Sequence, residues 1–156
     1  MNQPTSYRHT QSGKFIWLIL LIGLFILAIA ITVAGIVDQT MIVVTIVSIA
    51  ISFLLGWMFG SLTVSISGGL LNWWFGPGFW RKKVPVHDIA ACEAVRNYWW
   101  WGWGIRYYTK GWLYSISGLD AVELRLKSGK FIRIGTDQPE KLVMALRNHP
   151  EWAPEA

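Results

Sequence analysis

The sequence predicts an apolar helical hairpin followed by a small α+β domain, with about seven antiparallel strands in a sandwich or barrel and one C-terminal helix. Three observations lead to this fold class. The chain opens with two long uncharged runs, alternates apolar and polar residues from Leu62 onward, and carries a helix-start signal near its C-terminus. Alternation with a period of two is typical of strands, whereas apolar residues spaced by three and four indicate a helix.

The two uncharged runs are each long enough to cross a bilayer. They occupy residues 15–37 and 41–59, and only Asp38, Gln39 and Thr40 separate them. A hydrocarbon core about 30 Å thick requires roughly 20 apolar helical residues. Because backbone amides in lipid must be satisfied within a helix or a closed barrel, the runs predict an antiparallel transmembrane hairpin. A cleaved signal peptide would account for the first run only.

Basic residues on the flanks of the hairpin predict its orientation. Arg8 and Lys14 precede the first run, Arg81 is the first cation after the second, and the connection carries only Asp38. Lys and Arg are enriched on the cytoplasmic side of membrane proteins. We therefore expect both the N-terminus and the C-terminus to lie in the cytoplasm.

The chain of 156 residues divides into four predicted segments. Residues 1–14 are polar and lack apolar periodicity, so they are expected to form a flexible tail. Residues 15–60 form the hairpin, residues 61–149 form one folded domain, and residues 150–156 form a C-terminal tail. The length after the hairpin leaves room for a single small domain.

Glycine turns and alternating runs define the predicted strands. The turns Gly68-Gly69 and Ser128-Gly129 each stand between two alternating runs. Such two-residue turns tolerate the positive φ angles that hairpins require. The expected strands occupy residues 62–67, 70–75, 79–86, 88–96, 105–109, 112–116, 122–126 and 131–134.

A capped helix is predicted to close the domain. Asp137 and Glu140 have the spacing of a capping box, and Pro139 suits the first helical turn. The helix is expected to end near Asn148, because His149 is followed by a proline.

Three short motifs stand out in the folded part of the chain: Trp103-Gly104-Ile105-Arg106, Leu126-Lys127-Ser128-Gly129-Lys130, and Ile134-Gly135-Thr136-Asp137 leading into Pro139-Glu140. They resemble motifs of a known family, the small bacterial membrane proteins that carry a helical hairpin and a cytoplasmic pleckstrin-homology-like (PH-like) domain. The resemblance covers most of residues 62–147. It implies a PH-like fold, a multi-pass protein of the bacterial inner membrane, and a binding or assembly module without catalytic residues.

An aromatic segment follows the predicted strand at residues 88–96. The candidate protein-interface residues in it are Tyr98, Trp99, Trp100, Trp101, Trp103, Tyr107, Tyr108 and Trp112. Trp and Tyr combine an apolar body with a polar tip, which suits both protein interfaces and membrane interfaces. So many rings cannot all enter one small core. Burial against another subunit, insertion among lipid headgroups and packing within the domain are the alternatives.

A second candidate set lies near the point where the chain leaves the hairpin. The residues expected at lipid headgroups or at the membrane interface are Trp73, Trp74, Trp80, Arg81, Lys82, Lys83, Arg106 and Lys110. Anionic headgroups attract Lys and Arg beside a bilayer. The alternative is that these cations only set the topology and solvate a strand edge, and that some of the tryptophans pack in the core.

No residue is predicted to be catalytic or to bind a metal. The single cysteine, Cys92, excludes an intramolecular disulfide and a cysteine-based zinc cluster, so packing is its expected role. Asp88 and Glu93 fall on opposite faces of one predicted strand, and His87 has no nucleophile beside it in a recognised motif. Phosphate-binding and dinucleotide motifs do not occur. No cofactor, small-molecule substrate or nucleic acid is therefore expected.

The sequence favours a non-catalytic inner-membrane scaffold or adaptor whose cytoplasmic domain mediates protein assembly. The expected partners are membrane lipid and either copies of the same chain, in a homo-oligomer, or a membrane-protein complex. The alternatives are a sensor that binds anionic lipid and a ring or pore built from many hairpins. The uncharged runs favour an anchor over a conduit, because ionisable residues mark most pathways through membranes.

Overall fold

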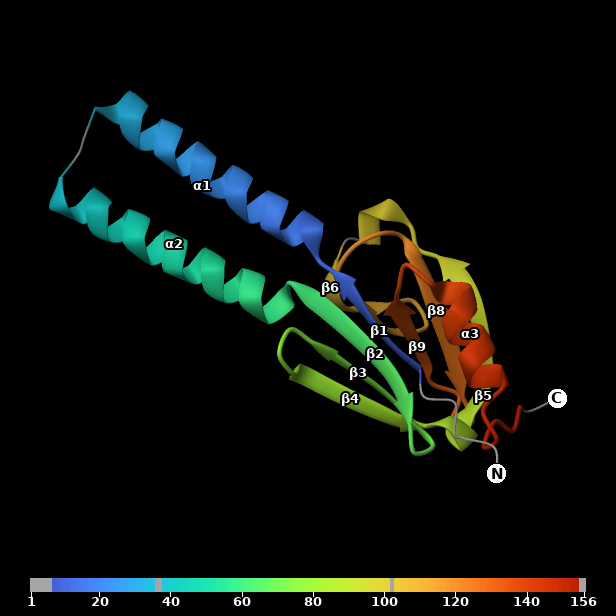
Figure 1. Cartoon of the computed structure of the whole chain (residues 1–156). Coiled ribbons are helices and arrows are strands. Elements are labelled where there is room, and N and C mark those ends of the chain that lie inside the picture. The colour runs from blue at the N-terminus through green and yellow to red at the C-terminus, as the bar shows by residue number, and fades with distance from the viewer. Residues whose placement is uncertain (1–6, 36–37, 102, 155–156) are drawn as a thin grey trace.

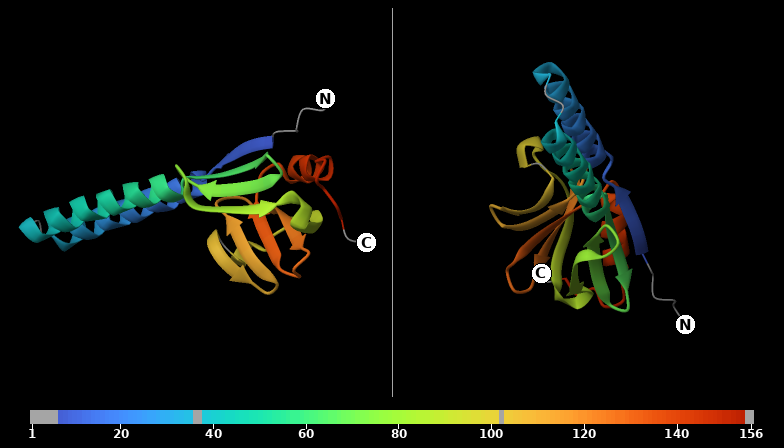
Figure 2. Two further views of the ribbon diagram at one scale, coloured as in Figure 1. Left: turned by 90° about the horizontal axis from the view of Figure 1, so that it is seen from below. Right: turned by 90° about the vertical axis from the view of Figure 1, so that its left-hand side faces the viewer.

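The computed structural model describes residues 7–35, 38–101 and 103–154, which form a helical hairpin joined to an α+β domain (Figure 1). The hairpin consists of α1 (Lys14–Ala34) and α2 (Gln39–Phe59). The two helices lie side by side and project away from the domain in every view (Figure 2). The predicted order of a helical hairpin followed by an α+β domain is confirmed.

Both helices are long and apolar enough to cross a membrane. No residue of α1 is buried, and Gly56 is the only buried residue of α2. The helices therefore present almost all of their apolar surface outward. Gln39 and Thr40, expected in the connection, belong to α2, because the Asp38 side chain accepts a hydrogen bond from the Met41 amide at 2.9 Å and caps the helix two residues before its expected start.

The first sheet contains four strands in the order β1-β2-β3-β4. They are β1 (Tyr7–Ser12), β2 (Ser61–Ser67), β3 (Leu70–Phe75) and β4 (Phe79–Pro85). The prediction of a flexible tail over residues 1–14 is wrong for residues 7–12, which pair with residues 61–66 of β2. The expected Gly68-Gly69 turn joins β2 to β3, and both of its glycines have positive φ.

The second sheet contains five strands in the order β5-β8-β9-β7-β6. They are β5 (Ile89–Arg96), β6 (Gly104–Tyr108), β7 (Gly111–Ser115), β8 (Asp120–Leu126) and β9 (Phe131–Gly135). The described residues thus form nine strands rather than about seven. The β8–β9 hairpin lies between β5 and β7. Strand β9 pairs with β7 in the parallel direction, so the expectation of a purely antiparallel domain is wrong for this pair.

The core lies between the two sheets and beneath α3 (Pro139–Arg147), which contacts β5 and β8. Leu142 and Leu146 are fully buried, and Cys92 packs among the core residues as expected. The predicted capping box does not form, because the N-cap residue is Gln138 and makes no side-chain cap. Asp137 instead binds His9 of β1.

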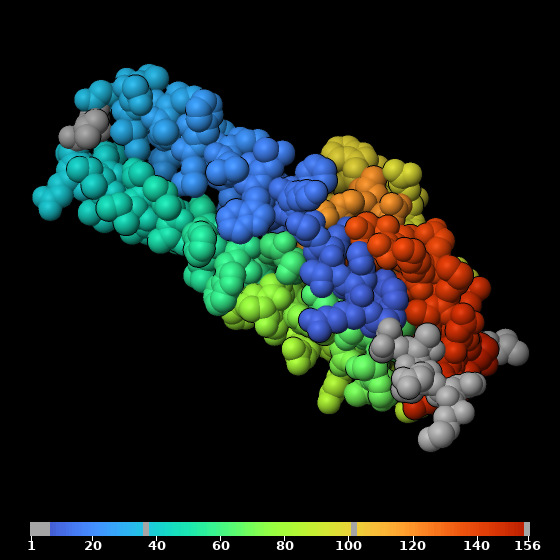
Figure 3. Space-filling view, viewed as in Figure 1, coloured from blue at the N-terminus to red at the C-terminus, as the bar shows by residue number. Residues whose placement is uncertain are grey.

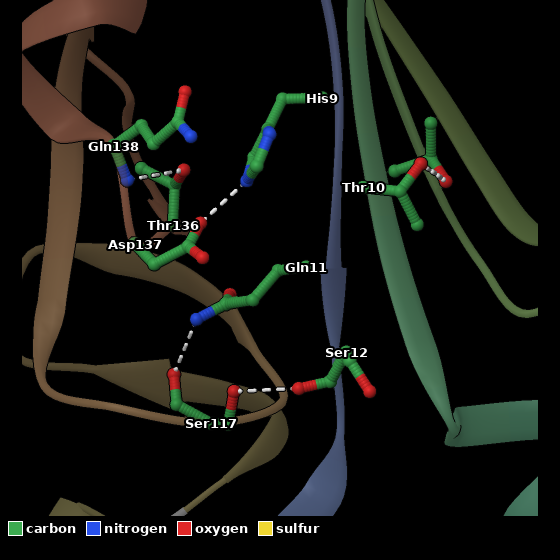
Figure 4. A network of polar contacts seen from close by, with 9 residues as sticks. His9, Thr10, Gln11, Ser12, Ser117, Thr136, Asp137 and Gln138 are labelled. Carbon is green, nitrogen blue, oxygen red and sulfur yellow. Dashed lines mark hydrogen bonds and ion pairs between the residues drawn. The ribbon is translucent and has the colours of Figure 1, made fainter.

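Polar side chains of β1 attach the first sheet to the second (Figure 4). His9 contacts the Asp137 carboxylate, and the buried Gln11 donates from Nε2 to the Ser117 carbonyl at 3.0 Å. Ser117 in turn donates from Oγ to the Ser12 carbonyl at 3.1 Å. In the space-filling view β1 lies between β2 and the segment that leads into α3 (Figure 3). The strand therefore bridges the two sheets.

The β1–β2 pair continues directly into the α1–α2 pair. Ser12 stands opposite Ser61 at the end of the ladder, and the Gly13 amide donates to the Gly60 carbonyl at 2.8 Å. One turn further along the helices, a Cβ on Gly56 would lie 2.6 Å from the Trp17 ring, so this glycine leaves the space that the indole occupies. Two paired strands thus fix the hairpin to the domain, and the contact between Trp17 and Gly56 holds the two helices together.

Replacement of Gly56 by leucine is expected to lower the free energy of unfolding by about 1–3 kcal/mol, because the new side chain overlaps the Trp17 ring. Thermal unfolding of the full chain in mild detergent measures the loss. Gly23→Leu is the matched control, since nothing lies within 4 Å of a Cβ at that position of α1. Trp17→Ala in the Gly56→Leu background is expected to restore part of the stability, and no recovery would contradict this contact.

Candidate functional site

Exposed aromatic rings gather on one side of the second sheet. After β5 the buried Asn97 turns the chain, with its amide donating to the Leu119 carbonyl at 2.6 Å. The short 3₁₀ helix η2 (Trp99–Trp101) follows, and β6 begins three residues later. Trp99 and Tyr107 are 75% and 70% exposed, so the structure leaves these rings outside the core.

Five of these rings form one surface. Tyr98 stacks on Trp100 with ring centroids 4.6 Å apart, and Trp99 meets Trp100 edge to face at 5.9 Å. Trp100 and Tyr107 line a common hollow of about 450 Å³. Tyr107 meets Trp112 edge to face at 5.7 Å. We call Tyr98, Trp99, Trp100, Tyr107 and Trp112 the aromatic surface; β6, which carries Tyr107, is an edge strand of its sheet.

Two members of the predicted protein interface lie elsewhere, and the side chain of a third is not described. Tyr108 is only 7% exposed, so its assignment to an interface is wrong. Trp103 stacks on Phe15 of α1 with ring centroids 5.4 Å apart, which places it where the hairpin meets the domain. The side chain of Trp101 lies outside the described residues.

A largely buried polar cluster lies beside the aromatic surface and includes Tyr108, the neighbour of Tyr107 on β6. The Tyr108 hydroxyl donates to Glu123 at 2.9 Å, and Arg133 donates to the same carboxylate and, from Nη1, to Asn97 at 3.1 Å. The Arg133 guanidinium also lies 4.7 Å from the centre of the Tyr108 ring. Burial, together with the Glu123 carboxylate, raises the pKa of Tyr108. Glu123 stands opposite Arg133 in the β8–β9 ladder, so the predicted hairpin register was the sequence signal for this pair.

A groove opens between β4 and β6, beside the start of α1. Its volume is about 730 Å³, and it is lined mainly by apolar and aromatic side chains. The walls include Ile16, Ile19, Phe59, Trp80, Ile105 and Arg106. Figure 3 shows the first turns of α1 lying against the olive and orange segments around η2 and β7. The groove therefore lies where the hairpin meets the domain.

Trp80 forms one wall of the groove in a strained conformation. Its φ of 44° lies in the left-handed region, which is costly for a bulky residue. The indole stacks on Phe59 at the end of α2, with ring centroids 5.3 Å apart. Packing against α2 therefore holds Trp80 in a backbone conformation that a bulky side chain disfavours.

The residues predicted to lie at lipid headgroups include a core tryptophan, cations that lie over aromatic rings, and exposed lysines. Trp73 is 1% exposed and packs on Tyr114, so its assignment to the membrane interface is wrong; it lies on the inward face of β3. Arg81 lies 4.8 Å from the centre of the Trp74 ring, and Lys110 lies 5.5 Å from that of Phe131. Lys82 and Lys83 are exposed and have no carboxylate partner within 4.0 Å among the described residues.

Among the described residues, the remaining titratable groups form no evident reaction centre. His87 lies 3.3 Å from Asp88 and 3.9 Å from Glu151, and all three side chains are exposed. In the part of the chain that the structure describes, no group of three or more His, Cys, Asp and Glu residues could hold a metal ion. Burial raises the pKa of the Cys92 thiol, which disfavours the reactive thiolate.

Searches against models of protein families and against curated proteins find no match to this chain. Functional inference therefore depends on the aromatic surface, the groove and the apolar hairpin.

Substitution of Tyr108 by phenylalanine is expected to cost about 1–2 kcal/mol at neutral pH through the lost hydrogen bond to Glu123. Because the folded-state pKa of Tyr108 is raised, its contribution is complete below about pH 10 and is lost as the pH rises through the folded value. The variant should therefore lose less stability than wild type on going from pH 9.5 to about 11.5. Thermal unfolding across this range measures both effects. The exposed Tyr107→Phe is the control, and equal alkaline slopes for Tyr108→Phe and wild type would contradict the prediction.

Proposed function

We propose that this chain is a non-catalytic assembly module anchored in a bacterial inner membrane. The hairpin spans the bilayer, the α+β domain lies in the cytoplasm, and the aromatic surface binds a second copy of the chain. The observation that carries the proposal is the group of five contiguous exposed rings beside an edge strand.

Exposure of the hairpin supports its place in the membrane. Each helix has 21 residues, and between them only Gly56 is buried. An apolar surface of this extent is far larger than the patches of a few hundred Å² that soluble proteins tolerate. Hydrocarbon would cover both helices without further contacts, because their backbone groups are bonded within each helix. The basic residues beside both inner ends favour cytoplasmic termini.

Composition of the aromatic surface supports a protein partner. Trp and Tyr dominate binding hot spots, because each ring buries a large area at little cost in conformational entropy. The surface carries no acidic side chain among its five members, and Arg106 lies at its edge in the hollow between Trp100 and Tyr107. Its centre is thus depleted in charge, as in the cores of protein interfaces.

A second copy is the partner that the anchoring favours. Because the β1–β2 ladder fixes the domain to the hairpin, every copy would carry the aromatic surface at one height above the membrane. Confinement to a plane raises the effective concentration of identical surfaces. Two copies related by an axis along the membrane normal would present the same residues to each other, as a twofold interface requires.

A PH-like relation for the domain is part of the proposal. The motifs around Trp103, Ser128 and Asp137, followed by the C-terminal helix, support it. The parallel β7–β9 pair and the added strand β1 are departures from the expected strand order. Even a shared fold would not transfer an activity.

Labelling of introduced cysteines tests the orientation. In a Cys92→Ser background, Gln39→Cys is expected to react with a membrane-impermeant maleimide added to intact spheroplasts, because it lies at the outer end of α2. Glu151→Cys is expected to react only after permeabilisation, because it follows α3 in the cytoplasm. The reverse pattern would contradict the proposed topology.

Particle mass tests the assembly. The full chain in mild detergent is expected to form an oligomer, and the combined variant Trp99→Ala, Trp100→Ala and Tyr107→Ala is expected to shift to the monomer mass. Light scattering after size exclusion measures the change. Met144→Ala removes an exposed apolar side chain from α3 and is the matched control.

Two outcomes would overturn the assembly proposal. A wild-type particle of monomer mass would remove the second copy as partner. An oligomer unchanged in the triple variant would assign association to another surface, and the exposed rings would then be better explained as an anchor among lipid headgroups. A cooperative thermal unfolding curve of the triple variant is required in either case, as the control that the variant is folded.

A further inference from the structure

We propose that the groove between β4 and β6 binds one anionic glycerophospholipid, with an acyl chain along α1 and the phosphate between Lys82 and Arg106. This site adjoins the aromatic surface at Trp112 and goes beyond the assembly function. It depends on the proposed membrane position of the hairpin, and not on formation of an oligomer.

The groove is an opening between the edges of the two sheets. β4 ends the first sheet, β6 ends the second, and neither strand pairs with the other. A second hollow of about 300 Å³ continues from the first, because Trp80 and Ile105 line both. The combined groove leads from α1 along the gap between β4 and β6, where Lys82, Trp112 and Tyr114 line its inner end.

The outer part of the groove has the character of an acyl-chain site. Ile16, Ile19 and Leu20 line it from the first two turns of α1, and their spacing puts them on one face of the helix. Phe59 and Trp80 form the facing wall. The apolar face of α1 continues beyond the groove toward Ala34, so a chain held here would extend into the hydrocarbon that surrounds the helix.

Two cations line the groove and give it the character of a phosphate site. Lys82 lines it and has no carboxylate partner among the described residues. Arg106 lines the outer part, where its Nε donates to the Trp103 carbonyl at 3.2 Å and fixes the guanidinium. Its Nη groups make no hydrogen bond in the described part of the chain. Two cations flanking an apolar groove match the charge of an anionic headgroup.

Lipid fits this groove better than a protein segment does. The groove opens onto α1, whose apolar side chains would be covered by acyl chains in the membrane. A bilayer supplies phospholipid at this position at very high local concentration, whereas a peptide strand added to β6 would need a partner for the charge of Lys82. The volume of the outer part lies within the roughly 300–1,000 Å³ of typical ligand sites.

Native mass spectrometry of the full chain in mild detergent tests the site, with added phosphatidylglycerol as the probe. One phosphatidylglycerol is expected to bind per chain, at least about tenfold more tightly than phosphatidylcholine. Lys82→Gln is expected to weaken this binding about tenfold, and Arg106→Gln similarly. Their matched controls are Lys83→Gln, next along β4, and Lys110→Gln, after β6; neither control residue lines the groove. Ile19→Trp fills the acyl-chain part and should abolish binding.

Equal binding of the two phospholipids, or equal effects of Lys82→Gln and Lys83→Gln, would overturn the site, since both indicate a general lipid annulus. Binding of inorganic phosphate as tight as that of phosphatidylglycerol would show an anion site without a lipid tail and would also overturn it. A peptide retained in the groove and displaced by Ile19→Trp would do the same. The triple aromatic-surface variant should still bind phosphatidylglycerol, which separates failure of this inference from failure of the assembly proposal.

Discussion

The continuation of the β1–β2 ladder into the α1–α2 hairpin is the constraint on which the rest of the structure depends. Ser12 pairs with Ser61, Gly13 bonds to Gly60, and the helices follow without a linker. A flexible connection would let the domain rotate beneath the hairpin. The paired strands remove that freedom, and the polar bonds from β1 to the second sheet fix the whole domain in the same orientation.

This fixed orientation brings two sheet edges to the base of the hairpin. The start of β4 and the segment before β6 both meet the helices, through the Trp80–Phe59 and Trp103–Phe15 stacks. An apolar groove and an exposed aromatic surface result, and they adjoin at Trp112. In the proposed membrane setting, one would take lipid and the other a second copy.

Neighbouring tryptophans have different roles because strands alternate their faces. Trp73 points into the core, whereas Trp74, one residue later, lies between the guanidinium groups of Arg8 and Arg81. Tyr107 and Tyr108 divide in the same way, with Tyr108 bonded to Glu123 inside the domain. The sequence analysis grouped these residues by type and position in the chain, and so assigned a common role to residues that the pleat separates.

The sequence by itself determined the hairpin, the β2–β3 and β8–β9 pairs and the C-terminal helix, because each has a local period or turn that encodes it. The sequence also identified the aromatic and basic segments, but not which of their side chains are buried and which are exposed. Only the tertiary structure decided β1, whose inward side chains His9 and Gln11 are polar and bind Asp137 and Ser117, more than 100 positions away. The groove likewise exists only where β4, β6 and α1 meet, because no local pattern records contacts between distant segments.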